Sequence, residues 1–409
     1  MASFYAEIKH KVLISFFKAL IKFAPTAATP MSFVGAGSTA KLCQHISRMG
    51  VRKVLIVSDK PLVGLRIVAT AGDVLAAEGV EVVIYDGVLP DPTFEVAAAG
   101  LSLQQQHRCD GVLAIGGGSA IDTAKTIAAA ATNGADVKAM VGFFKAKVMP
   151  LPLFAIPTTS GTGSEVTFGA VISDAQTHEK HIVGDPKIVP RAVALDPALI
   201  TGLPAPITAA TGMDALTHAI EAYVSTWAAP QHDAYAVMAV KMIFSSLPIA
   251  YANGADLQAR EQMSIAAYYA GLAINGAAVG NVHAIAHQLG AWYGTPHGLA
   301  NALVMPRVLW FSKDAMSPRL AELADLLALG KTSDSVNVKA ANFIKAVEDL
   351  NQTLGIRNKL PAIQQQDIAA IAARAVKEGA GYPVAKLMDQ DDCETILRAL
   401  SDGDSPAAT

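Results

Sequence analysis

Short apolar runs alternate with stretches of helical spacing over the first half of the chain. Six runs have strand-like, β-branched character: residues 54–57, 82–85, 111–115, 152–156, 168–172 and 192–195. A helix-like stretch over residues 62–79 separates the first two runs. Strands that alternate with helices indicate βαβ units and a parallel sheet. We therefore predict an α/β, Rossmann-like N-terminal domain over residues 31–203.

The pattern changes after about residue 203. From there to about residue 400 the chain has helical spacing throughout, with only Gly and Pro breaks. We predict an all-α C-terminal domain over residues 204–409. A chain of 409 residues exceeds the usual size of a single core, so two domains also agree with its length.

The N-terminus has a pattern of its own. Residues 4–23 are apolar and basic at helical spacing, and Pro25 ends the run. We predict an N-terminal amphipathic helical segment within residues 1–30. It packs on the body or on another subunit, or else makes a weak contact with a membrane surface. Lys18 and Lys22 interrupt the apolar region, so a signal peptide is not expected.

Composition excludes several kinds of partner. The formal charge is −3 and only 16% of residues are charged, so no basic field for nucleic acid exists. Gly, Pro or charge interrupts each apolar run, so we expect no transmembrane segment. The three cysteines are widely separated and form neither a metal pattern nor an even disulfide set. A reducing cytoplasm is the expected compartment.

Acidic and imidazole side chains recur at helical spacing in the predicted helical domain. Asp214 and His218 are four residues apart, as are His283 and His287, so each pair shares one helix face. A lone histidine in an apolar stretch is usually a satisfied core residue. This grouping instead predicts a shared metal site. The residues between His283 and His287 are Ala-Ile-Ala, so the HExxH motif of zinc peptidases is absent.

A further histidine lies at a predicted helix start. Thr295-Pro296-His297 has the order of an N-cap Thr, a Pro at the first helical position and then His. Imidazole nitrogens with one carboxylate suit Fe(II), Zn(II) or a similar ion. Spacing alone does not choose which of the four histidines bind it.

A glycine-rich turn is the first nucleotide signal. Gly116-Gly117-Gly118-Ser119 follows the run 111–115 and opens a helix that contains Asp122 and Lys125. Glycines let a pyrophosphate approach the backbone closely, and a helix N-terminus favours an anion. The turn lacks the GxGxxG and GK[ST] spacings, so a simple tight turn is the alternative.

A hydroxyl-rich loop is the second signal. Residues 157–167 (PTTSGTGSEVT) follow another apolar run and offer hydrogen-bonding groups to ribose, amide and phosphate. A polar surface turn is the alternative. Asp59, just after the first strand, could accept a hydrogen bond from an adenine-ribose 2′-hydroxyl and would repel a 2′-phosphate. This favours NAD over NADP.

Taken together, these segments resemble the iron-containing, group III alcohol dehydrogenases from about residue 32 onward. The specific parts are DGVLAIGGGS at 110–119, the loop at 157–167, TGMDALTHAIEAYVS at 211–225 and HAIAHQLGAWYGTPHG at 283–298. The resemblance implies a Rossmann-like domain and a helical domain of the dehydroquinate synthase-like fold. NAD(P) and a divalent ion would lie in a cleft between them.

The resemblance also implies roles for individual residues. The metal ligands would be Asp214, His218, His283 and His297. His287 would lie near the nicotinamide, and we expect it to relay the proton. The implied cofactor-binding residues are Asp59, Asp91, Gly117, Gly118, Ser119, Thr158, Thr159, Thr162, Thr167 and Lys180. Asp91 departs from the Asn common in the family, and Tyr382 replaces the Asn of a common Asn-Pro pair.

The activity implied is reversible, NAD-dependent oxidation of a primary or small secondary alcohol to its aldehyde or ketone. The metal would be Fe²⁺, with Zn²⁺ as the alternative, and the protein would be a cytoplasmic homodimer or larger homo-oligomer. Two other functions stay open. One is a lyase or cyclase of the dehydroquinate synthase-like fold that uses NAD transiently with zinc. The other is a noncatalytic metal- or nucleotide-binding protein, which would be expected to have lost a ligand.

Overall fold

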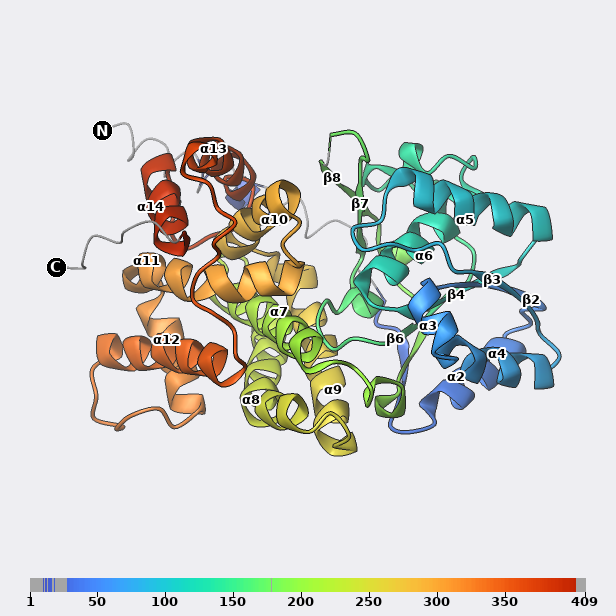
Figure 1. Ribbon diagram of the computed structural model, residues 1–409, viewed down its shortest axis with the longest axis horizontal. Coiled ribbons are helices and arrows are strands. Elements are labelled where there is room, and N and C mark those ends of the chain that lie inside the picture. The colour runs from blue at the N-terminus through green and yellow to red at the C-terminus, as the bar shows by residue number, and fades with distance from the viewer. Residues whose placement is uncertain are drawn as a thin grey trace. The chain divides into compact units, whose positions relative to one another are not determined.

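A computed structural model describes His10, Val12, residues 14–16, Lys18, and residues 28–177 and 179–401. The chain divides into two compact units (Figure 1). The helical unit comprises Met1–Ala24, Pro204–Ala252 and Leu272–Thr409, and the sheet unit comprises Pro25–Leu203 and Asn253–Gly271. The predicted domain limits, 1–30, 31–203 and 204–409, stay predictions.

The predicted parallel sheet forms the centre of the sheet unit, and it has six strands. Its strands follow the order β1 (Met31–Val34), β9 (Ala192–Leu195), β6 (Leu153–Pro157), β4 (Gly111–Gly116), β2 (Lys53–Val57) and β3 (Glu81–Tyr85). All neighbouring strands in this sheet are parallel. Five of the six apolar runs therefore form strands of one sheet.

Helices cover both faces of this sheet (Figure 1). Alternate residues of the central strands, such as Val54, Ile56 and Leu113, pack with α2 (Ser38–Arg48) and α4 (Ile67–Ala77) in one hydrophobic core. The other face packs against α5 (Phe94–His107) and α6 (Gly118–Thr132). Burial on both faces explains why the central strands are continuous apolar runs rather than alternating ones.

The sixth apolar run lies in a different sheet. This three-stranded sheet has the order β5 (Gly142–Phe143), β8 (Lys180–Gly184) and β7 (Gly169–Ser173). Strand β7, predicted as 168–172, pairs antiparallel with β8, while β5 pairs parallel with β8. The sequence pattern did not predict β1, β5 or β8.

The prediction of one continuous helix over residues 62–79 is wrong. The segment forms two helices, α3 (Lys60–Gly64) and α4, because Arg66 adopts a left-handed conformation with φ of 60°. This conformation is uncommon for a residue with a side chain. Gly64, the last residue of α3, is the mark of the break in the sequence.

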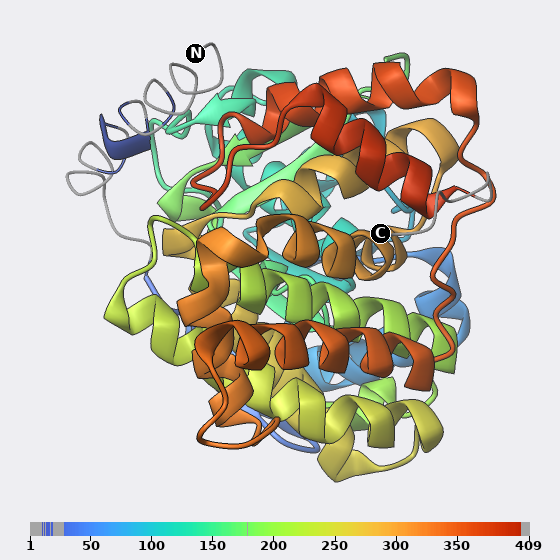
Figure 2. The same cartoon turned by 90° about the vertical axis from the view of Figure 1, so that its left-hand side faces the viewer.

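The region after residue 203 is all-helical, as predicted. Figure 2 looks onto this part of the chain. The helices are α7 (Ala205–Val224), α8 (Pro230–Ala252), α9 (Leu257–Ala277), α10 (Asn281–Tyr293), α11 (His297–Leu326), α12 (Val336–Thr353), α13 (Ile368–Gly379) and α14 (Gln390–Leu400). Helix α7 is buried along most of its length and packs against α8 and α11.

Helix α8 has the length and apolar composition that a membrane crossing needs, which the sequence analysis did not expect. Helices α9 and α10 meet the same measure only as a pair, and that pair is bent by 108°. The core helices of soluble proteins also meet this measure. Residues such as Ala236, Val240 and Ile243 of α8 are buried, and the helix packs along α7.

Only part of the predicted N-terminal helix is described. His10, Val12, residues 14–16 and Lys18 are helical, and His10 Nε2 lies 2.9 Å from the carbonyl oxygen of Tyr382. The rest of the predicted segment within 1–30, including most of 4–23, lies outside the described residues.

Candidate metal centre and nucleotide loop

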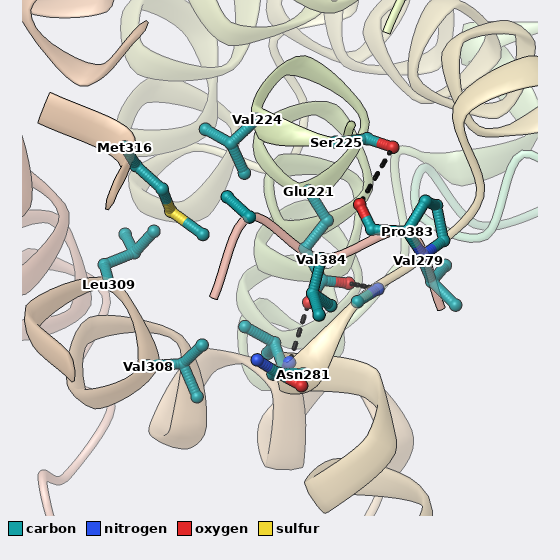
Figure 3. A pocket seen from close by; sticks show the side chains of 13 residues that line it. Glu221, Val224, Ser225, Val279, Asn281, Val308, Leu309, Met316, Pro383 and Val384 are labelled. Atoms are coloured by element: carbon teal, nitrogen blue, oxygen red, sulfur yellow. Dashed lines mark hydrogen bonds between the residues drawn. The ribbon is translucent and has the colours of Figure 1, made fainter. Parts of the chain in front are cut away.

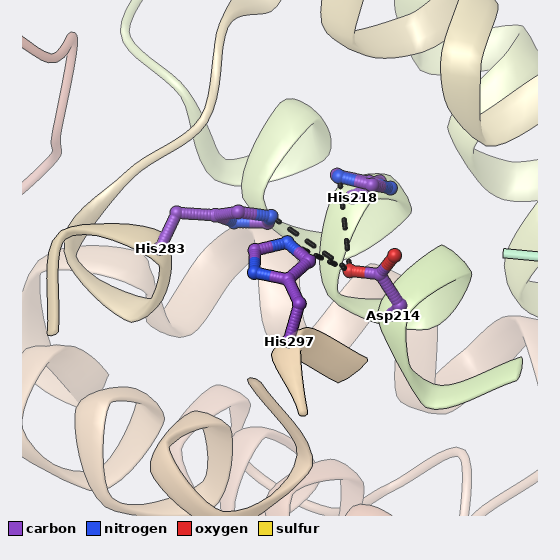
Figure 4. A group of neighbouring side chains, drawn as sticks. All are labelled: Asp214, His218, His283 and His297. Carbon is purple, nitrogen blue, oxygen red and sulfur yellow. Dashed lines mark ion pairs between the residues drawn. The ribbon is translucent and has the colours of Figure 1, made fainter. Parts of the chain in front are cut away.

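Four side chains of the helical unit converge on one point (Figure 4). Helix α7 carries Asp214 and His218, α10 carries His283 in its first turn, and α11 begins at His297. One possible ligand atom from each residue lies within 4.8 Å of the others. We refer to these four residues as the donor cluster. Asp214, His218 and His283 are buried, and the side chain of His297 is 31% exposed.

The start of α11 differs by one residue from the prediction. Pro296 is the N-cap and His297 is the first helical residue, whereas the sequence pattern placed the cap at Thr295. The Pro296 backbone is extended, with φ of −53° and ψ of 132°, so the helical turn begins after it. His297 still lies at the helix N-terminus.

Distances within the donor cluster are those expected of atoms that share an ion. The Nε2 atom of His297 lies 3.4 Å from Asp214 Oδ1, and those of His218 and His283 each lie 3.9 Å from the same oxygen. These separations are too long for good hydrogen bonds. Ligand atoms about 2.1 Å from a tetrahedral ion would lie about 3.4 Å apart.

The ring nitrogen of His218 that faces Asp214 Oδ1 is Nε2, as it is in His283 and His297. The His218 ring stacks on that of His283, with centroids 4.7 Å apart. Three imidazoles and one carboxylate are a suitable donor set for Fe²⁺ or Zn²⁺.

Glu221, one helical turn beyond His218 on α7, orients His283. Its Oε2 atom lies 2.6 Å from His283 Nδ1 and accepts a hydrogen bond from Gly280 N at 2.8 Å. Its Oε1 atom accepts one from Val282 N at 2.7 Å. With the Nδ1 proton directed at Glu221, the Nε2 lone pair of His283 is available to a metal ion.

Glu221 also borders a small, mainly apolar cavity (Figure 3). Its apolar lining includes Val224, Val279, Val308, Leu309 and Met316. Burial raises the pKa of Glu221 to about 7, although hydrogen bonds from the backbone of Gly280 and Val282 oppose this rise. A nearby cation would also favour the ionised carboxylate.

Asn301 holds Asp214 in place. It lies one turn after His297 on α11, is fully buried, and its Nδ2 atom donates to Asp214 Oδ1 at 2.7 Å. The same nitrogen lies 3.2 Å from Nε2 of both His283 and His297.

The sequence analysis missed both supporting residues. The spacings from His218 to Glu221 and from His297 to Asn301 are three and four residues. Each pair therefore shares a helix face. This signal could have identified both residues.

His287 lies beside the donor cluster rather than within it. Its ring stacks on that of His297, with centroids 5.3 Å apart and planes at 19°. Its Nδ1 atom lies 2.6 Å from Oε1 of Glu378, on α13. The four residues brought together are those that the resemblance implied, and spacing alone would have paired His283 with His287. Metal binding by the four, and the role of His287, stay predictions.

In the sheet unit, two predicted nucleotide elements lie at a switch in strand order. The chain passes from β2 to its neighbour β3 and then to β4 on the other side of β2. Asp59 follows β2, and Gly117 to Ser119 follow β4. Open parallel sheets bind ligands at the carboxyl ends of such strand pairs. Asp59 also caps α3, because its Oδ1 accepts a hydrogen bond from Leu62 N at 2.8 Å.

The hydroxyl-rich loop packs against the start of α6. Gly117 is the N-cap of α6, and Gly118 is its first residue. A Cβ atom on Gly118 would lie 2.7 Å from Cγ2 of Thr162, and one on Gly117 would lie 3.2 Å from Oγ1 of Thr159. The two glycines thus allow the loop to approach the helix N-terminus. Ser119 lies in the same first turn.

The predicted cofactor residues Thr158, Asp91 and Lys180 make other contacts. Thr158 is buried and its N–H donates to Gly116 O at 3.0 Å. Asp91 and Lys180 form an ion pair, with 3.3 Å between Oδ1 and Nζ. Asp91 has a left-handed backbone with φ of 50°. Asp and Asn are the side-chain-bearing residues that adopt this conformation most readily, which fits either residue at position 91.

A buried lysine fixes the end of the loop. Lys125 is fully buried on α6, and its Nζ donates to Ser164 Oγ at 3.2 Å, Thr167 O at 2.8 Å and Gly169 O at 2.6 Å. Burial lowers its pKa to about 8, although the nearby Asp122 opposes this shift.

Asp122 completes this arrangement, since both its oxygens accept hydrogen bonds. The donors are Ser164 Oγ at 2.5 Å and Val171 N at 2.8 Å. We refer to Asp122, Lys125, Ser164 and Thr167 as the lysine cluster. It joins α6 to the hydroxyl-rich loop.

Comparison with known proteins identifies relatives over almost the whole chain. The family model of iron-containing alcohol dehydrogenase matches residues 29–197. The model of the C-terminal region of the Fe-containing alcohol dehydrogenase family matches residues 208–401.

Individual relatives agree with this match. An NAD-dependent methanol dehydrogenase from Bacillus methanolicus is 38% identical over 90% of this chain and 97% of its own length. A lactaldehyde reductase from Escherichia coli strain K12 is 36% identical over 85% of this chain and 91% of its own. Among solved structures, a 1,3-propanediol oxidoreductase superposes with a TM-score of 0.89 at 36% identity, covering 91% of this chain and 98% of that one.

Proposed function

The chain belongs to the iron-containing alcohol dehydrogenase family, and we propose that it oxidises primary and small secondary alcohols reversibly with NAD. The donor cluster is the observation that carries this proposal. All four metal-binding positions that the resemblance implies are present, and their donor atoms are suitably spaced. A noncatalytic derivative of the fold would be expected to have lost one of them.

We propose that Asp214, His218, His283 and His297 hold a divalent ion. Family membership favours Fe²⁺, while the same donors suit Zn²⁺. When bound, such an ion supplies Lewis acidity and lowers the pKa of a hydroxyl that it coordinates. Glu221 and Asn301 support this role, since they orient His283 and Asp214 respectively.

The protein residues must also handle the released proton. Oxidation of R₂CH–OH by NAD⁺ gives R₂C=O, NADH and H⁺: the carbinol hydrogen leaves as hydride, and the hydroxyl proton leaves separately. We propose that His287 relays this proton. Its side chain is 20% exposed and its ring lies against His297, so it is both next to the donor cluster and accessible.

The NAD site is proposed at the switch in strand order of the sheet unit. Asp59 would face the adenine ribose, and Gly117, Gly118 and Ser119 would bind the pyrophosphate. Thr158, Thr159, Thr162 and Thr167 would surround the cofactor. Asp91 and Lys180 would act together near the nicotinamide ribose, and their ion pair supports this pairing. Asp122 receives no role toward substrate, because both its oxygens already accept hydrogen bonds.

The proposed substrates are small alcohols and the matching carbonyl compounds. The related proteins carry names that refer to methanol, lactaldehyde and 1,3-propanediol, so the family accommodates short chains with one or more oxygens.

We also infer that the protein acts in the cytoplasm as a homodimer or larger homo-oligomer. All three cysteines are buried as free thiols, which agrees with a reducing compartment. Light scattering coupled to size-exclusion chromatography would test the oligomeric state.

Absorbance at the reduced-nicotinamide band tests the proposed activity directly. The purified protein would receive NAD and ethanol, butanol, hexanol or 1,3-propanediol. NADH should form with at least one alcohol, stop after chelation and return with added Fe²⁺ or Zn²⁺. A lyase or cyclase would turn over its substrate without net NADH, and a noncatalytic binder would form no NADH.

A further inference from the structure

A hydrogen-bonded carboxylate lies behind His287 in the helical unit. Glu378, at the C-terminal end of α13, accepts three side-chain hydrogen bonds. One comes from His287 Nδ1 at 2.6 Å and one from the hydroxyl of Tyr382 at 2.7 Å, both to Oε1. The third comes from Gln288 Nε2 to Oε2 at 2.8 Å. Three donors therefore converge on one carboxylate.

This arrangement determines which way each proton is directed. Burial alone would raise the pKa of Glu378, but hydrogen bonds from His287, Tyr382 and Gln288 outweigh it and hold the pKa below its usual value. Burial, with Glu378 nearby, raises the pKa of Tyr382 well above its usual value, so its hydroxyl stays protonated. Glu378 is thus an acceptor, and His287 Nδ1 is the donor.

The position of the ring follows from the same contacts. Glu378 and the stacked ring of His297 contact His287 from two sides, and the ring of His283 approaches it edge-on with centroids 5.7 Å apart. A neutral imidazole with its proton on Nδ1 carries its lone pair on Nε2. Only one ring orientation keeps the bond to Glu378.

We propose that Glu378 is the positioning residue of His287: it fixes the ring orientation and the Nδ1–H tautomer, leaving Nε2 free to accept a proton. Tyr382 and Gln288 hold Glu378 in turn. This inference rests on the proposed function for the proton relay by His287. The tautomer itself is a property of the protein that can be measured without turnover.

Glu378→Gln tests the proposal with little change in size. In the metal-loaded enzyme, kcat should fall about 10- to 100-fold, as is typical when a partner that orients a functional imidazole is lost. The KM for the alcohol and the bound metal should stay near wild type. Tyr382→Phe, which removes one of the three donors, should give a smaller fall in kcat in the same direction. It also provides a second test if Glu378→Gln does not fold.

A matched control comes from Glu348. It lies on α12, is exposed, and accepts a hydrogen bond from Trp310 Nε1 at 2.9 Å. Glu348→Gln therefore makes the same chemical change to another carboxylate that accepts from an aromatic N–H group. Its kcat and KM should match those of the wild type.

Nitrogen-15 NMR gives the second readout. Full-length protein with ¹⁵N-labelled histidine would be loaded with Zn²⁺, a d¹⁰ ion that causes no paramagnetic broadening. The signals of His287 are those lost in His287→Asn. Wild type should show a protonated Nδ1 and an unprotonated Nε2, and Glu378→Gln should show a mixture of tautomers.

The outcomes separate this proposal from the proposed function. If Glu378→Gln keeps the wild-type tautomer, Glu378 does not position His287, whatever happens to kcat. Loss of metal in this variant would instead make Glu378 a support of the donor cluster and would also overturn the proposal. If wild type forms no NADH with any alcohol, the proposed function fails, while the NMR result still decides the tautomer.

Discussion

The donor cluster of the helical unit and the lysine cluster of the sheet unit bury similar polar groups in opposite ways. In the lysine cluster, Lys125 Nζ contacts its oxygen partners at 2.6–3.2 Å, and both oxygens of Asp122 accept hydrogen bonds. In the donor cluster, three imidazoles lie 3.4–3.9 Å from Asp214 Oδ1. The groups of the lysine cluster are close enough to hydrogen-bond one another, whereas the imidazoles of the donor cluster lie too far from Asp214 Oδ1 for good hydrogen bonds.

This difference distinguishes a polar group that supports the fold from one that binds a ligand. Buried polar atoms normally find partners within the protein, so each exception needs a reason. In the donor cluster, three Nε2 atoms converge on one carboxylate oxygen at distances too long for good hydrogen bonds to it, and a shared ion would account for this geometry. The hydrogen bonds of the lysine cluster instead join α6 to its loop, so this cluster should contribute to stability whether or not any ligand is bound.

The largest expected effect concerns the donor cluster. His297→Ala should lose the bound metal, and activity should fall at least about 1,000-fold, more than the loss of one orienting partner. His287→Ala is the matched control, because it removes a neighbouring imidazole that is not one of the four. It should keep the metal while turnover falls. Metal content by mass spectrometry and NADH formation would be measured on both variants.

Two results would contradict this assignment. A full equivalent of metal and unchanged turnover in His297→Ala would remove His297 from the set of ligands. Loss of metal from His287→Ala would add His287 to it. Either result would mean that the distances between the four side chains of the donor cluster do not identify the metal ligands correctly.

Substitution within the lysine cluster should lower the free energy of unfolding. Lys125→Met removes the donor of the hydrogen bonds from Nζ and the cation near the buried Asp122, and we expect this to cost about 3–5 kcal/mol of unfolding free energy. The loss should be the same with and without added metal. Lys345→Met is the control, because Lys345 pairs with Asp349 on the surface, where the side chains are 68% and 59% exposed. It should change stability by less than about 0.5 kcal/mol.

Urea unfolding of both variants, with and without metal, measures this prediction. A loss below about 1 kcal/mol for Lys125→Met would mean that the lysine cluster contributes no more than an ordinary surface site. If the stability loss appears only in the presence of metal, the lysine cluster does not stabilise the fold independently of a bound ligand.

Much of the fold could be predicted because the central strands are buried on both faces. Such strands are continuous apolar runs, and β2, β4, β6 and β9 lie within one residue of the predicted limits. The strands that were missed lack this signal: β1 is largely exposed, β5 has two residues, and β8 begins with Lys180 and His181. Arg66, whose left-handed backbone divides α3 from α4, does not itself signal a break, but Gly64 at the end of α3 could have done so.

For the candidate site, the sequence predicted the contacts within one helix but not those between distant helices. Helical spacing placed Asp214 with His218, and it could have added Glu221 and Asn301. Spacing also paired His283 with His287, but in the structure these two histidines have different hydrogen-bond partners. His283 bonds Glu221, and His287 bonds Glu378, 91 residues further along the chain. Spacing within one helix carries no information about contacts between distant helices.

A smaller effect should come from Glu165, a buried carboxyl group beside the lysine cluster. Burial raises its pKa to about 7, and Lys125 opposes this shift only in part. Between its ordinary pKa and about 7 the folded state holds the proton more tightly than the unfolded state. Stability should therefore fall as pH rises through this range, by up to about 3 kcal/mol.

Glu165→Gln should remove this contribution, so the variant gains stability relative to wild type between about pH 5 and 7. Glu78→Gln, on the exposed end of α4, is the control and should keep the wild-type pH profile. Unfolding free energies at several pH values would be compared. A difference between Glu165→Gln and wild type that does not change with pH would mean that Glu165 titrates normally.

The smallest effect is expected at Asp59, which combines the two kinds of behaviour within one side chain. One oxygen caps α3 through Leu62 N, as in a group that supports the fold. The negative charge is predicted to repel the 2′-phosphate of NADP, as in a group that selects a ligand. Asp59→Asn separates the two roles, since Asn is an equally good N-cap but carries no charge. Stability should stay within about 0.5 kcal/mol of wild type, while the ratio of kcat/KM for NAD to that for NADP should fall about 10-fold, or about 1.4 kcal/mol.

Asp59→Ala loses both the cap and the charge, so it should show the same change in ratio together with a loss of about 1 kcal/mol in stability. If the ratio changes in Asp59→Ala but not in Asp59→Asn, the cap and not the charge positions the cofactor, and Asp59 belongs with the residues that support the fold.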